Sequence, residues 1–318
     1  MRRNKIGNGT VGITELSFGA AGIGNLFTPV DPADARKAVD AAWDAGIRYF
    51  DTAPHYGLGL SEERLGDALR ERPRAAYVVS TKVGRLLKPG PGEGDDLSNG
   101  FAVPADRHRV WDFSADGVRR SIEESLVRLG TDRIDIAYLH DPDDHAEDAF
   151  RYAYPALEQL RADGVVGAIG AGMNQTAMLT RFLRDTDADV VLCAGRCTLL
   201  DQSALDTLLP EAQARGRSVV VGGVFNSGLL ADPRPGAPYD YGAAPAGVLD
   251  RALRMKAVCE RYGVPLRAAA LQFPRRHPAV ASVLVGTRSA AEVRDAAEML
   301  ETGIPEALWD ELAALREG

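Results

Sequence analysis

Lysine is scarce in this chain of 318 residues: the 37 basic residues include only five lysines, and the others are arginines. Cysteine is scarce as well, with three residues and no Cys-x-x-Cys pair. Cys193 and Cys197 could ligate zinc, but no second ligand pair lies nearby in the sequence, so we expect no metal site. This use of cysteine is typical of a reducing compartment, and we therefore expect a cytoplasmic protein.

Long apolar runs and concentrated positive charge are also missing. No uninterrupted apolar stretch is long enough to span a bilayer, so we expect no membrane contact, and the basic N-terminus lacks the apolar segment of a signal peptide. The net charge is −8 and no basic stripe with interleaved aromatics occurs, which argues against nucleic acid as a partner. A small-molecule substrate is the partner we expect, and the sequence leaves the oligomeric state open.

Eight short apolar segments alternate with amphipathic helical patterns. Each segment is rich in β-branched residues and nearly continuous in hydrophobicity, as strands are when both faces are buried. The predicted helices include one with Asp31 as N-cap and Pro32 at its first position, one opening near Ser61, and one running from Ser114 to Gly130. The predicted strands are 16–20, 48–52, 77–82, 134–140, 165–172, 189–194, 218–224 and 281–286, and further helical patterns cover about 147–163, 175–185, 203–215 and 290–301.

Eight strands alternating with helices predict a closed parallel (β/α)8 TIM barrel, formed by residues 1–318 as a single domain. The alternative, an open doubly wound sheet, usually carries G-x-G-x-x-G after its first strand. The stretch GAAGIGN at 19–25 resembles that motif weakly, because the next helix begins too late. We interpret its glycines as a flexible loop at the barrel mouth. Residues 1–15 predict a β-hairpin with a turn at Asn8-Gly9 that closes the bottom of the barrel.

Two long segments rich in Gly, Pro and Asp interrupt the alternation, at 85–113 and 231–247. We predict irregular loops there. Both follow predicted strands, so both should lie on the C-terminal face, where barrel active sites sit. Long loops in compact domains are usually functional lids or disordered segments, and simple insertions remain the alternative.

Four ionisable side chains follow three consecutive predicted strands. The stretch DTAPHYG places Asp51 and Tyr56 after the second strand, Lys82 ends the third, and His140 ends the fourth. Each has an ordinary explanation alone, such as a turn cap, a packed aromatic or a core histidine. Because the ends of parallel strands meet at one mouth, we expect the four to form one site.

This combination suits proton transfer. A free phenol titrates near pH ~10, and a nearby ammonium would favour the phenolate. Asp51 would keep Lys82 charged, and Lys82 would tune Tyr56 as the acid or base. His140 would orient the reacting oxygen. Hydride transfer needs such a proton relay together with a cofactor.

The segments DTAPHYG, STKVG, SIEESLVRLGTDRIDIAYLHDPD and GVVGAIGAGMNQ resemble, in this order, the aldo-keto reductases. The resemblance implies a (β/α)8 barrel with a nicotinamide cofactor at its C-terminal face, and a catalytic tetrad of Asp51, Tyr56, Lys82 and His140. The segments VWDFSADGVRRSIEESL, HDPDD, GAGMNQ and VFNSGLL are similar to segments of the branch that oxidises L-fucose, D-threo-aldoses, D-arabinose or pyridoxal. That branch implies oxidation of a cyclic hemiacetal to a lactone.

The resemblance also implies where ligands bind. The family's usual Ser-Asn pair after the fifth strand is reduced to Asn174, and the usual glutamine of the sixth strand has no counterpart at 194–196. For the substrate we expect Asn25, Leu26 and Trp111, although Trp111 could instead pack its loop onto the barrel. The expected cofactor contacts are Asn174, Phe225, Asn226, Ser227, Gly228, Leu229, Gly286, Thr287, Arg288, Ser289 and Glu292.

Cofactor choice depends on two side chains of opposite charge. Glu292 falls where NADPH-dependent relatives place a basic residue, and a carboxylate repels the 2′-phosphate of NADP but can accept a hydrogen bond from a ribose hydroxyl. Arg288 favours phosphate. We favour NAD over NADP, and aldose oxidation as the function. The alternatives are a general NADPH-dependent aldehyde or ketone reductase, a pathway-specific biosynthetic reductase, and a redox-sensing binding subunit like the potassium-channel β subunits.

Overall fold

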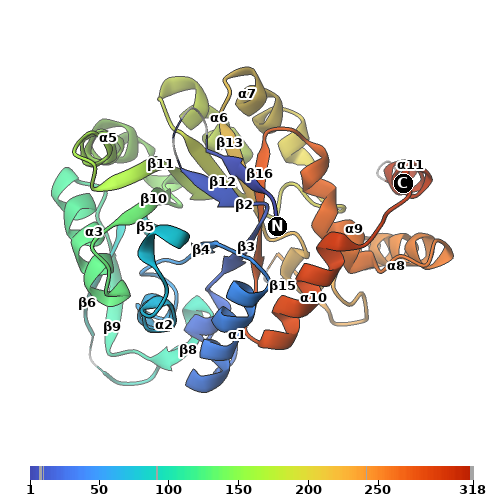
Figure 1. Cartoon of the computed structure of the whole chain (residues 1–318), viewed down its shortest axis with the longest axis horizontal. Helices are drawn as coiled ribbons and strands as arrows, with labels where there is room; N and C mark the ends of the chain where they lie inside the picture. The colour runs from blue at the N-terminus through green and yellow to red at the C-terminus, as the bar shows by residue number, and fades with distance from the viewer. Residues whose placement is uncertain (7–8, 10, 91, 241, 316–318) are drawn as a thin grey trace.

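Eight parallel strands close into a barrel in the computed structural model, which describes residues 1–6, 9, 11–90, 92–240 and 242–315. Each strand pairs with the next barrel strand in chain order, and the last pairs with the first. All eight predicted strands are confirmed, and with them the (β/α)8 barrel (Figure 1). The strands are β3 (Leu16–Gly19), β4 (Tyr49–Asp51), β5 (Val78–Val83), β10 (Ile134–His140), β11 (Val166–Met173), β12 (Val190–Ala194), β13 (Ser218–Gly222) and β16 (Val280–Gly286).

Side chains alternate between the inside and the outside of the barrel. Tyr49, Ile136 and Tyr138 belong to a buried cluster inside the barrel. Their neighbours Phe50 and Ala137 belong to the larger cluster between the strands and the helices. Because both faces of each strand are buried, the strands have the continuous apolar sequences from which they were predicted.

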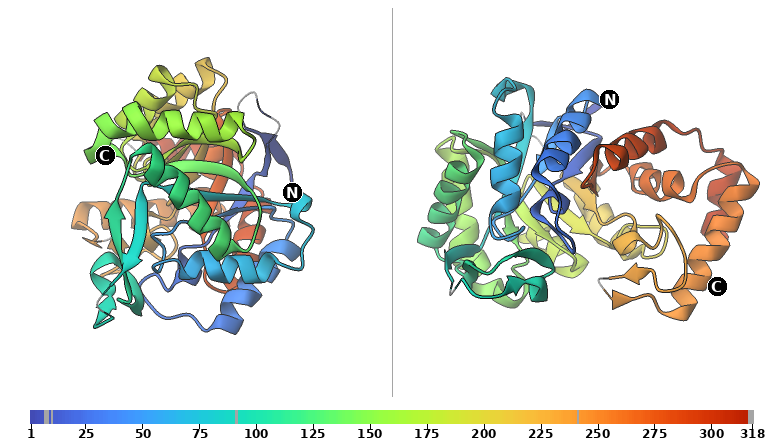
Figure 2. Two further views of the ribbon diagram at one scale, coloured as in Figure 1. Left: turned by 90° about the vertical axis from the view of Figure 1, so that its left-hand side faces the viewer. Right: turned by 90° about the horizontal axis from the view of Figure 1, so that it is seen from below.

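Helices surround the barrel (Figures 1 and 2). As predicted, Asp31 caps the first of them, accepting from the Ala33 backbone N–H at 2.8 Å, and Ser114 caps the helix that ends at Gly130 with φ 61°. The helices are α1 (Pro32–Asp44), α2 (Leu60–Leu69), α3 (Ala115–Leu129), α4 (Ala146–Asp148), the π-helical turn Ala149–Ala153, α5 (Tyr154–Ala162), α6 (Thr176–Asp185), α7 (Leu208–Ala214), α8 (Ala246–Arg261), α9 (Leu266–Gln272), α10 (Ala290–Glu301) and α11 (Glu306–Ala314).

The sequence patterns did not predict α8, α9 and α11. These helices are preceded by Pro245, Pro265 and Pro305, and none has a side-chain hydrogen bond at its N-cap. The Ser, Thr, Asp or Asn signal that marks most helix starts is therefore missing at all three. In Figure 1, α8 and α11 extend to the right of the barrel.

The segment 85–113 is folded, so the prediction of an irregular loop is wrong. Within it β6 (Arg85–Pro89) pairs antiparallel with β9 (Arg107–Trp111), and β7 (Asp95–Asp96) pairs with β8 (Phe101–Pro104). Its apolar side chains pack with Leu58 into a core cluster of their own. We term residues 85–111 the insertion. Among its described residues, the other long segment, 231–247, contains the short pair β14 (Pro238–Tyr239) and β15 (Gly242–Ala243) and the first residues of α8.

The glycines of GAAGIGN are tightly packed, and the prediction of a flexible loop there is wrong. Gly22–Gly24 form a short 3-10 turn. A Cβ atom added at Gly22 would lie 2.7 Å from the Thr287 carbonyl oxygen, and one at Gly24 would lie 3.0 Å from the Tyr56 carbonyl oxygen. Glycine is therefore needed for the loop after β3 to press against the loops after β4 and β16.

The N-terminal residues form the predicted hairpin. Strand β1 (Arg3–Lys5) pairs antiparallel with β2 (Gly12–Thr14), and Ile6 and Ile13 pack into the cluster inside the barrel. The hairpin therefore closes the N-terminal end of the barrel. Asn8 of the predicted turn lies outside the described residues.

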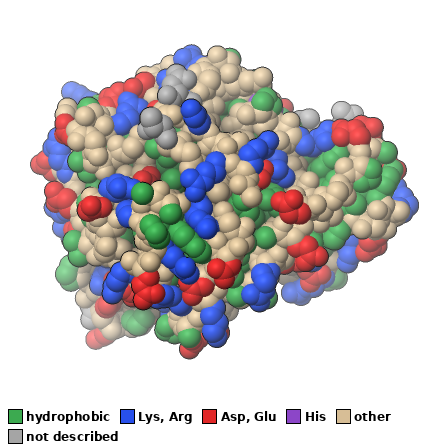
Figure 3. All heavy atoms as spheres, in the orientation of Figure 1, with side chains coloured by type: hydrophobic (Ala, Val, Ile, Leu, Met, Phe, Trp, Pro, Cys, Tyr) green, Lys and Arg blue, Asp and Glu red, His purple; other side chains and the backbone are tan. Residues whose placement is uncertain are grey.

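Charged side chains of both signs intermingle over the face shown in Figure 3. Within the described ranges, no helix is long and apolar enough to cross a membrane. The same residues contain no group of three or more His, Cys, Asp or Glu side chains placed to hold a metal ion. Cys193 and Cys197 are buried, and burial raises the pKa of Cys197 to about 12, so its thiol stays protonated.

Candidate active site

Three neighbouring strands bring the four predicted catalytic side chains together at the C-terminal end of the barrel. Asp51 ends β4, Lys82 lies near the end of β5, His140 ends β10, and Tyr56 lies in the loop after β4. The side chains of Asp51 and Lys82 are each 2% exposed. The ring centroids of Tyr56 and His140 are 5.9 Å apart, with the rings nearly perpendicular. Strand order and strand length thus gather the four groups at one point of the mouth.

The ammonium group of Lys82 uses all three of its N–H donors. It donates to Asp51 Oδ2 at 2.6 Å, to the Tyr56 hydroxyl at 2.9 Å and to the Thr52 carbonyl at 3.0 Å. Burial acts to lower the pKa of Lys82, but the charge of Asp51 and the contacts with Tyr56 outweigh it and raise that pKa. Lys82 is therefore charged beside the Tyr56 oxygen, an arrangement that stabilises a phenolate.

Two neutral histidines lie against Tyr56. The rings of His55 and His140 are 5.5 Å apart between centroids. Burial, followed by the positive charges of Arg85 and Lys82, lowers the pKa of His140 well below its usual value. Burial, followed by neighbouring positive charges, lowers the pKa of His55 to about 2. A neutral imidazole has one donor and one acceptor, so His140 can orient a hydroxyl or a carbonyl oxygen.

Because His55 and His140 are buried as neutral side chains, we expect the protein to lose stability in mild acid. Histidine in the unfolded chain has a pKa of about 6.5, whereas in the folded protein the pKa values of His55 and His140 are both lowered. At a pH between the lowered folded values and ~6.5, the unfolded chain binds more protons than the folded protein. The contribution of the two histidines to the free energy of unfolding is therefore complete above pH ~6.5 and is lost as the pH falls below it. Each contributes a slope of up to about 1.4 kcal/mol per pH unit. Urea midpoints measured across this range should therefore fall with pH.

His55→Asn isolates one of these contributions. Its urea midpoint should depend less steeply on pH than that of the wild type. His108→Asn, on the exposed side of β9, is the matched control and should follow the wild-type curve. Parallel curves for His55→Asn and the wild type would contradict the burial of a neutral His55.

Two arginines of the insertion reach the surroundings of the tetrad. Arg85 is ion-paired with Asp141, the residue that follows β10. Arg109 donates to the two carboxylate oxygens of Asp96 at 2.8 and 2.6 Å, and to the backbone oxygen of His55 at 2.6 Å. The Nε atoms of both arginines are buried and have no partner among the described residues. A buried donor without a partner costs free energy. A hydrogen bond from either N–H group to a water or ligand oxygen would therefore be favourable.

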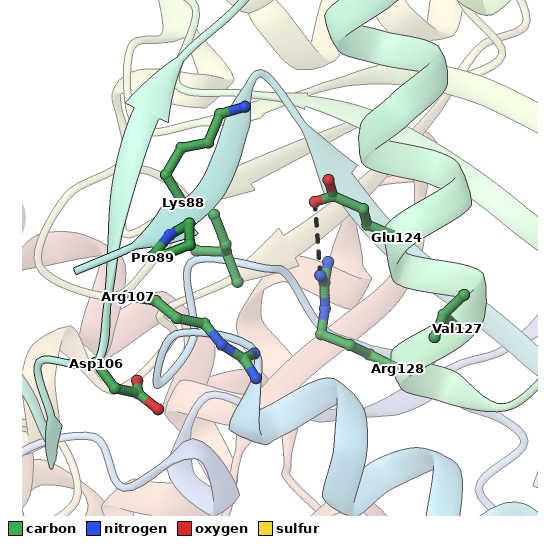
Figure 4. Close-up of a pocket in the computed structure, with 8 residues that line it drawn as sticks. Lys88, Pro89, Asp106, Arg107, Glu124, Val127 and Arg128 are labelled. Carbon is green, nitrogen blue, oxygen red and sulfur yellow. Dashed lines mark ion pairs between the residues drawn. The ribbon is translucent and has the colours of Figure 1, made fainter. Parts of the chain in front are cut away.

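Two cavities border the insertion. One, of about 410 Å³, is lined by Arg85, Arg109 and Trp111 among others. The other, of about 460 Å³, lies between β6, β9 and α3 (Figure 4). In Figure 4, Glu124 and Arg128 of α3 form an ion pair across from Lys88 of β6. No tetrad side chain lines either cavity. The first shares two arginines with the surroundings of the tetrad, so it is the better candidate for a substrate despite its smaller volume.

Asn25 and Leu26, two predicted substrate residues, lie where the first barrel loop meets the insertion. The Asn25 side chain accepts from the Val30 N–H at 2.9 Å and from Arg64 at 2.8 Å, and donates to the Ala102 carbonyl at 3.1 Å. It therefore ties the loop to the insertion. Leu26 forms an isolated β-bridge with the insertion. Contact of either with a substrate stays a prediction.

Trp111 is 45% exposed and covers Arg85. The Arg85 guanidinium lies 4.3 Å from its ring centroid, and the rings of Phe113 and His145 lie at 5.9 and 4.9 Å. These contacts hold the end of the insertion against the loop after β10. Stacking of Trp111 on a sugar stays a prediction.

The loops after β13 and β16 lie across the barrel from the tetrad strands. A Cβ atom added at Gly228 or Gly286 would meet no atom within 4 Å, so both glycines border open space. Nearby, Asn226 Oδ1 and Thr287 Oγ1 are buried and have no partner among the described residues. Polar atoms next to open space suit a polar ligand such as a nicotinamide cofactor, so these loops fit one.

The other predicted cofactor residues follow the ends of the barrel strands at the same face. Asn174 follows β11 and is half-buried, as is Phe225 after β13. Ser227 lies two residues after Phe225 and has a left-handed backbone with φ 60°. The Leu229 side chain is buried in the main core, so only its backbone can face a ligand.

Three predicted cofactor residues form the junction between β16 and α10. Ser289 caps α10 by accepting from the Glu292 backbone N–H at 3.2 Å. Glu292 accepts from the Arg288 backbone N–H at 2.7 Å, and its other oxygen lies 3.8 Å from the Arg288 guanidinium. Arg288 also donates to Thr28 at 2.8 Å. The charge of Arg288 is therefore partly balanced by a carboxylate.

The sequence motifs did not predict roles for His55, Arg85 and Arg109. His55 lies within DTAPHYG, the stretch that revealed Asp51 and Tyr56. Arg109 and Trp111 alternate along β9, which places them on the same face as Arg85 of the paired strand. In the sequence this face appears only as Arg107-x-Arg109-x-Trp111, which lacks the apolar and polar alternation that marks a half-buried strand.

Comparison with known proteins adds to this geometry. Residues 15–317 match the Aldo/keto reductase family. The chain belongs to this family. It is 50% identical over 310 residues to a D-threo-aldose 1-dehydrogenase of a Pseudomonas species, covering 96% of this chain and 94% of that protein. It is 42% identical over 330 residues to a pyridoxal 4-dehydrogenase of Microbacterium luteolum, covering 98% and 96%.

Solved structures of aldo-keto reductases share the fold. The holo form of an aldo-keto reductase from Bacillus halodurans superposes with a TM-score of 0.78 at 26% identity, covering 100% of this chain and 97% of that chain. The family resemblance inferred from the sequence motifs is confirmed. This aldo/keto reductase is therefore an oxidoreductase that uses a nicotinamide cofactor.

Proposed function

We propose that this aldo/keto reductase, acting as one domain, oxidises the anomeric carbon of an aldose in its cyclic hemiacetal form and yields a lactone. The observation that carries the proposal is the fully engaged, charged Lys82 beside the Tyr56 hydroxyl. The names of the two relatives at 50% and 42% identity support the substrate class.

The chain's own groups move the proton. Tyr56, as phenolate, removes the proton of the anomeric hydroxyl. Lys82 stabilises the phenolate, and Asp51 keeps Lys82 charged and in place. The neutral ring of His140 holds the anomeric oxygen by a hydrogen bond as it becomes the carbonyl oxygen. A bound nicotinamide would supply the hydride acceptor that the two-electron oxidation of the anomeric carbon requires.

The cofactor would lie across the mouth from the tetrad. Asn174 would bind the carboxamide, and Phe225 would stack on the nicotinamide ring. The loop after β13 would bind the pyrophosphate, and the β16–α10 junction would bind the adenosine. The residues assigned to these roles are Asn174, Phe225, Asn226, Ser227, Gly228, Leu229, Gly286, Thr287, Arg288, Ser289 and Glu292.

The remaining hydroxyls of the sugar would extend toward the insertion. The 410 Å³ cavity there combines Arg85, Arg109 and Trp111. Arg85 and Arg109 each pair with an aspartate, so the two pairs carry little net charge. Such pairs suit neutral hydroxyl groups, which both donate and accept hydrogen bonds, better than they suit a phosphorylated sugar.

Glu292 would make the enzyme prefer NAD to NADP. Its carboxylate balances Arg288 and would repel a 2′-phosphate. In Glu292→Ala, kcat/KM for NADP should rise relative to NAD by about tenfold, equivalent to about 1.4 kcal/mol. Steady-state rates with both cofactors measure this ratio. Glu298→Ala, in the same helix beyond its first turn, is the control and should keep the wild-type ratio.

The proposed function is tested by initial rates of NAD(P)H formation at alkaline pH. The panel contains L-fucose, D-arabinose, L-galactose and pyridoxal, each with NAD and with NADP. Rapid reduction of either cofactor with one sugar supports hemiacetal oxidation. If protein that still binds the cofactor forms no NAD(P)H with any sugar, hemiacetal oxidation is contradicted. NADPH consumption with simple aldehydes would then indicate a general reductase.

A further inference from the structure

Each barrel strand that carries a buried tetrad residue also carries a hydroxyl residue two positions earlier. The three pairs are Tyr49 with Asp51, Ser80 with Lys82, and Tyr138 with His140. Side chains alternate along a strand with a period of two, so both members of each pair point into the barrel. The strands β4, β5 and β10 are neighbours. A layer of three hydroxyl groups therefore lies directly beneath the tetrad.

These hydroxyls form a continuous chain that ends on the tetrad. The Tyr138 and Tyr49 hydroxyls are 3.1 Å apart, and the Tyr49 hydroxyl lies 3.0 Å from Ser80 Oγ. Ser80 donates to Asp51 Oδ1 at 2.7 Å. The other oxygen of Asp51 accepts from Lys82 at 2.6 Å. All five side chains are buried, so water does not interrupt the chain.

The direction of every hydrogen bond in this chain is fixed. An ionised carboxylate only accepts, so the single O–H of Ser80 is committed to Asp51. Ser80 must then accept from Tyr49, and Tyr49 must accept from Tyr138. Burial raises the pKa of both tyrosines, so both keep the protons that they donate. All three O–H dipoles consequently point toward the carboxylate of Asp51.

We propose that Tyr138, Tyr49 and Ser80 are positioning residues whose aligned hydroxyls hold the Asp51 carboxylate and, through Lys82, tune Tyr56. The inference rests on the proposed role of Tyr56 as the base. Hydrogen bonds that point the same way polarise one another, by about 10–30% per bond, so the chain stabilises Asp51 more than Ser80 alone would. Without it, the Asp51 carboxylate would be more basic and would offset more of the positive charge of Lys82, so the ammonium would stabilise the Tyr56 phenolate less.

The barrel leaves room for this layer. Gly170 of β11 pairs with Tyr138, and Gly172 pairs with His140. A Cβ atom added at Gly172 would touch Tyr138 Cβ at 3.8 Å and Lys82 Cε at 3.9 Å. Strand β11 thus has no side chain at the two positions that pair with Tyr138 and His140, and the polar chain fits within the packed interior.

The test compares Ser80→Ala, Tyr49→Phe and Tyr138→Phe with the wild type. Tyr154→Phe is the matched control, because its buried hydroxyl donates to Asp187 at 2.7 Å among the outer helices, away from the tetrad. The first readout is the pH profile of kcat for sugar oxidation. The second is the tyrosinate absorbance titration without substrate, taken as the difference from the same variant carrying Tyr56→Phe.

Both midpoints should move to higher pH by about one unit in Ser80→Ala, which corresponds to a tenfold change in the protonation equilibrium. The shift should decrease from Ser80→Ala to Tyr49→Phe to Tyr138→Phe. Tyr154→Phe should lose thermal stability without any shift. KM for the cofactor should stay at the wild-type value in all four.

Wild-type midpoints in Ser80→Ala and Tyr49→Phe, with a loss of stability like that of Tyr154→Phe, would overturn the inference and leave the hydroxyls a purely structural role. A failure of the proposed function has a different signature. In that case Tyr56→Phe retains turnover or no sugar is oxidised. The absorbance titration still measures the effect of the hydroxyl chain on the pKa of Tyr56. If Ser80→Ala does not fold, the two Tyr→Phe variants alone decide the question.

Discussion

Tyr56→Phe should reduce kcat for sugar oxidation by about 10³-fold, within the range of about 10²–10⁴ that general acid–base catalysis supplies. The phenylalanine ring keeps the packing of Tyr56 against His140 and Phe101 but removes the atom that accepts from Lys82. No other described side chain combines a hydroxyl with a contact to this ammonium. The proton would have no acceptor in the right place, and kcat is the measurement that reports it.

The matched control is Tyr152→Phe, which removes the hydroxyl of an exposed tyrosine outside the barrel. It should turn over at the wild-type rate. Cofactor binding, followed by fluorescence, should be unchanged in both variants. A Tyr56→Phe enzyme with kcat within tenfold of the wild type would show that another group takes the proton.

Lys82→Met should destabilise the fold by about 3–5 kcal/mol, the usual cost of removing one partner from a buried ion pair. It leaves Asp51 charged and 2% exposed, with Ser80 as its remaining donor. Activity should be lost as well, because the phenolate of Tyr56 loses its counter-ion. The midpoint of urea unfolding measures the first effect and kcat the second.

The double variant Asp51→Asn/Lys82→Met separates the two effects. Removing both charges should restore much of the stability, because the double variant no longer buries an unpaired charge. The enzyme should remain inactive. Lys37→Met, which removes the exposed partner of Asp34, should leave the unfolding midpoint nearly unchanged. If the double variant were no more stable than Lys82→Met, a buried unpaired charge could not be the cause of the instability.

The barrel could be predicted because its strands are buried on both faces and its best helices carry explicit start signals. The continuous apolar runs located all eight strands, and the caps at Asp31 and Ser114 located two helices. Helices that begin after proline without a side-chain cap were missed, as with Pro245 before α8. Their position depends on packing against the rest of the molecule, which local pattern does not encode.

Some residues of the site could be predicted from the sequence and others could not. Asp51, Lys82 and His140 were predictable because strand ends and alternation fix where they point. The contacts of Arg85 and Arg109 depend on the insertion folding back over the mouth, and its Gly- and Pro-rich sequence hid the strands that make this possible. Gly22 was misjudged for a related reason: its glycine is required by a neighbour that lies far away in the sequence, at Thr287.

The saturated environment of Lys82 has a chemical consequence for an enzyme that handles carbonyl compounds. A neutral lysine amine attacks aldehydes and ketones and condenses with them to an imine. Lys82 has no lone pair to offer, because its raised pKa keeps it protonated and its three N–H groups are held by three oxygens. The same contacts that make it a counter-ion therefore protect it from condensation with reactive carbonyls, and the enzyme can place an amine beside an electrophile without being inactivated by it.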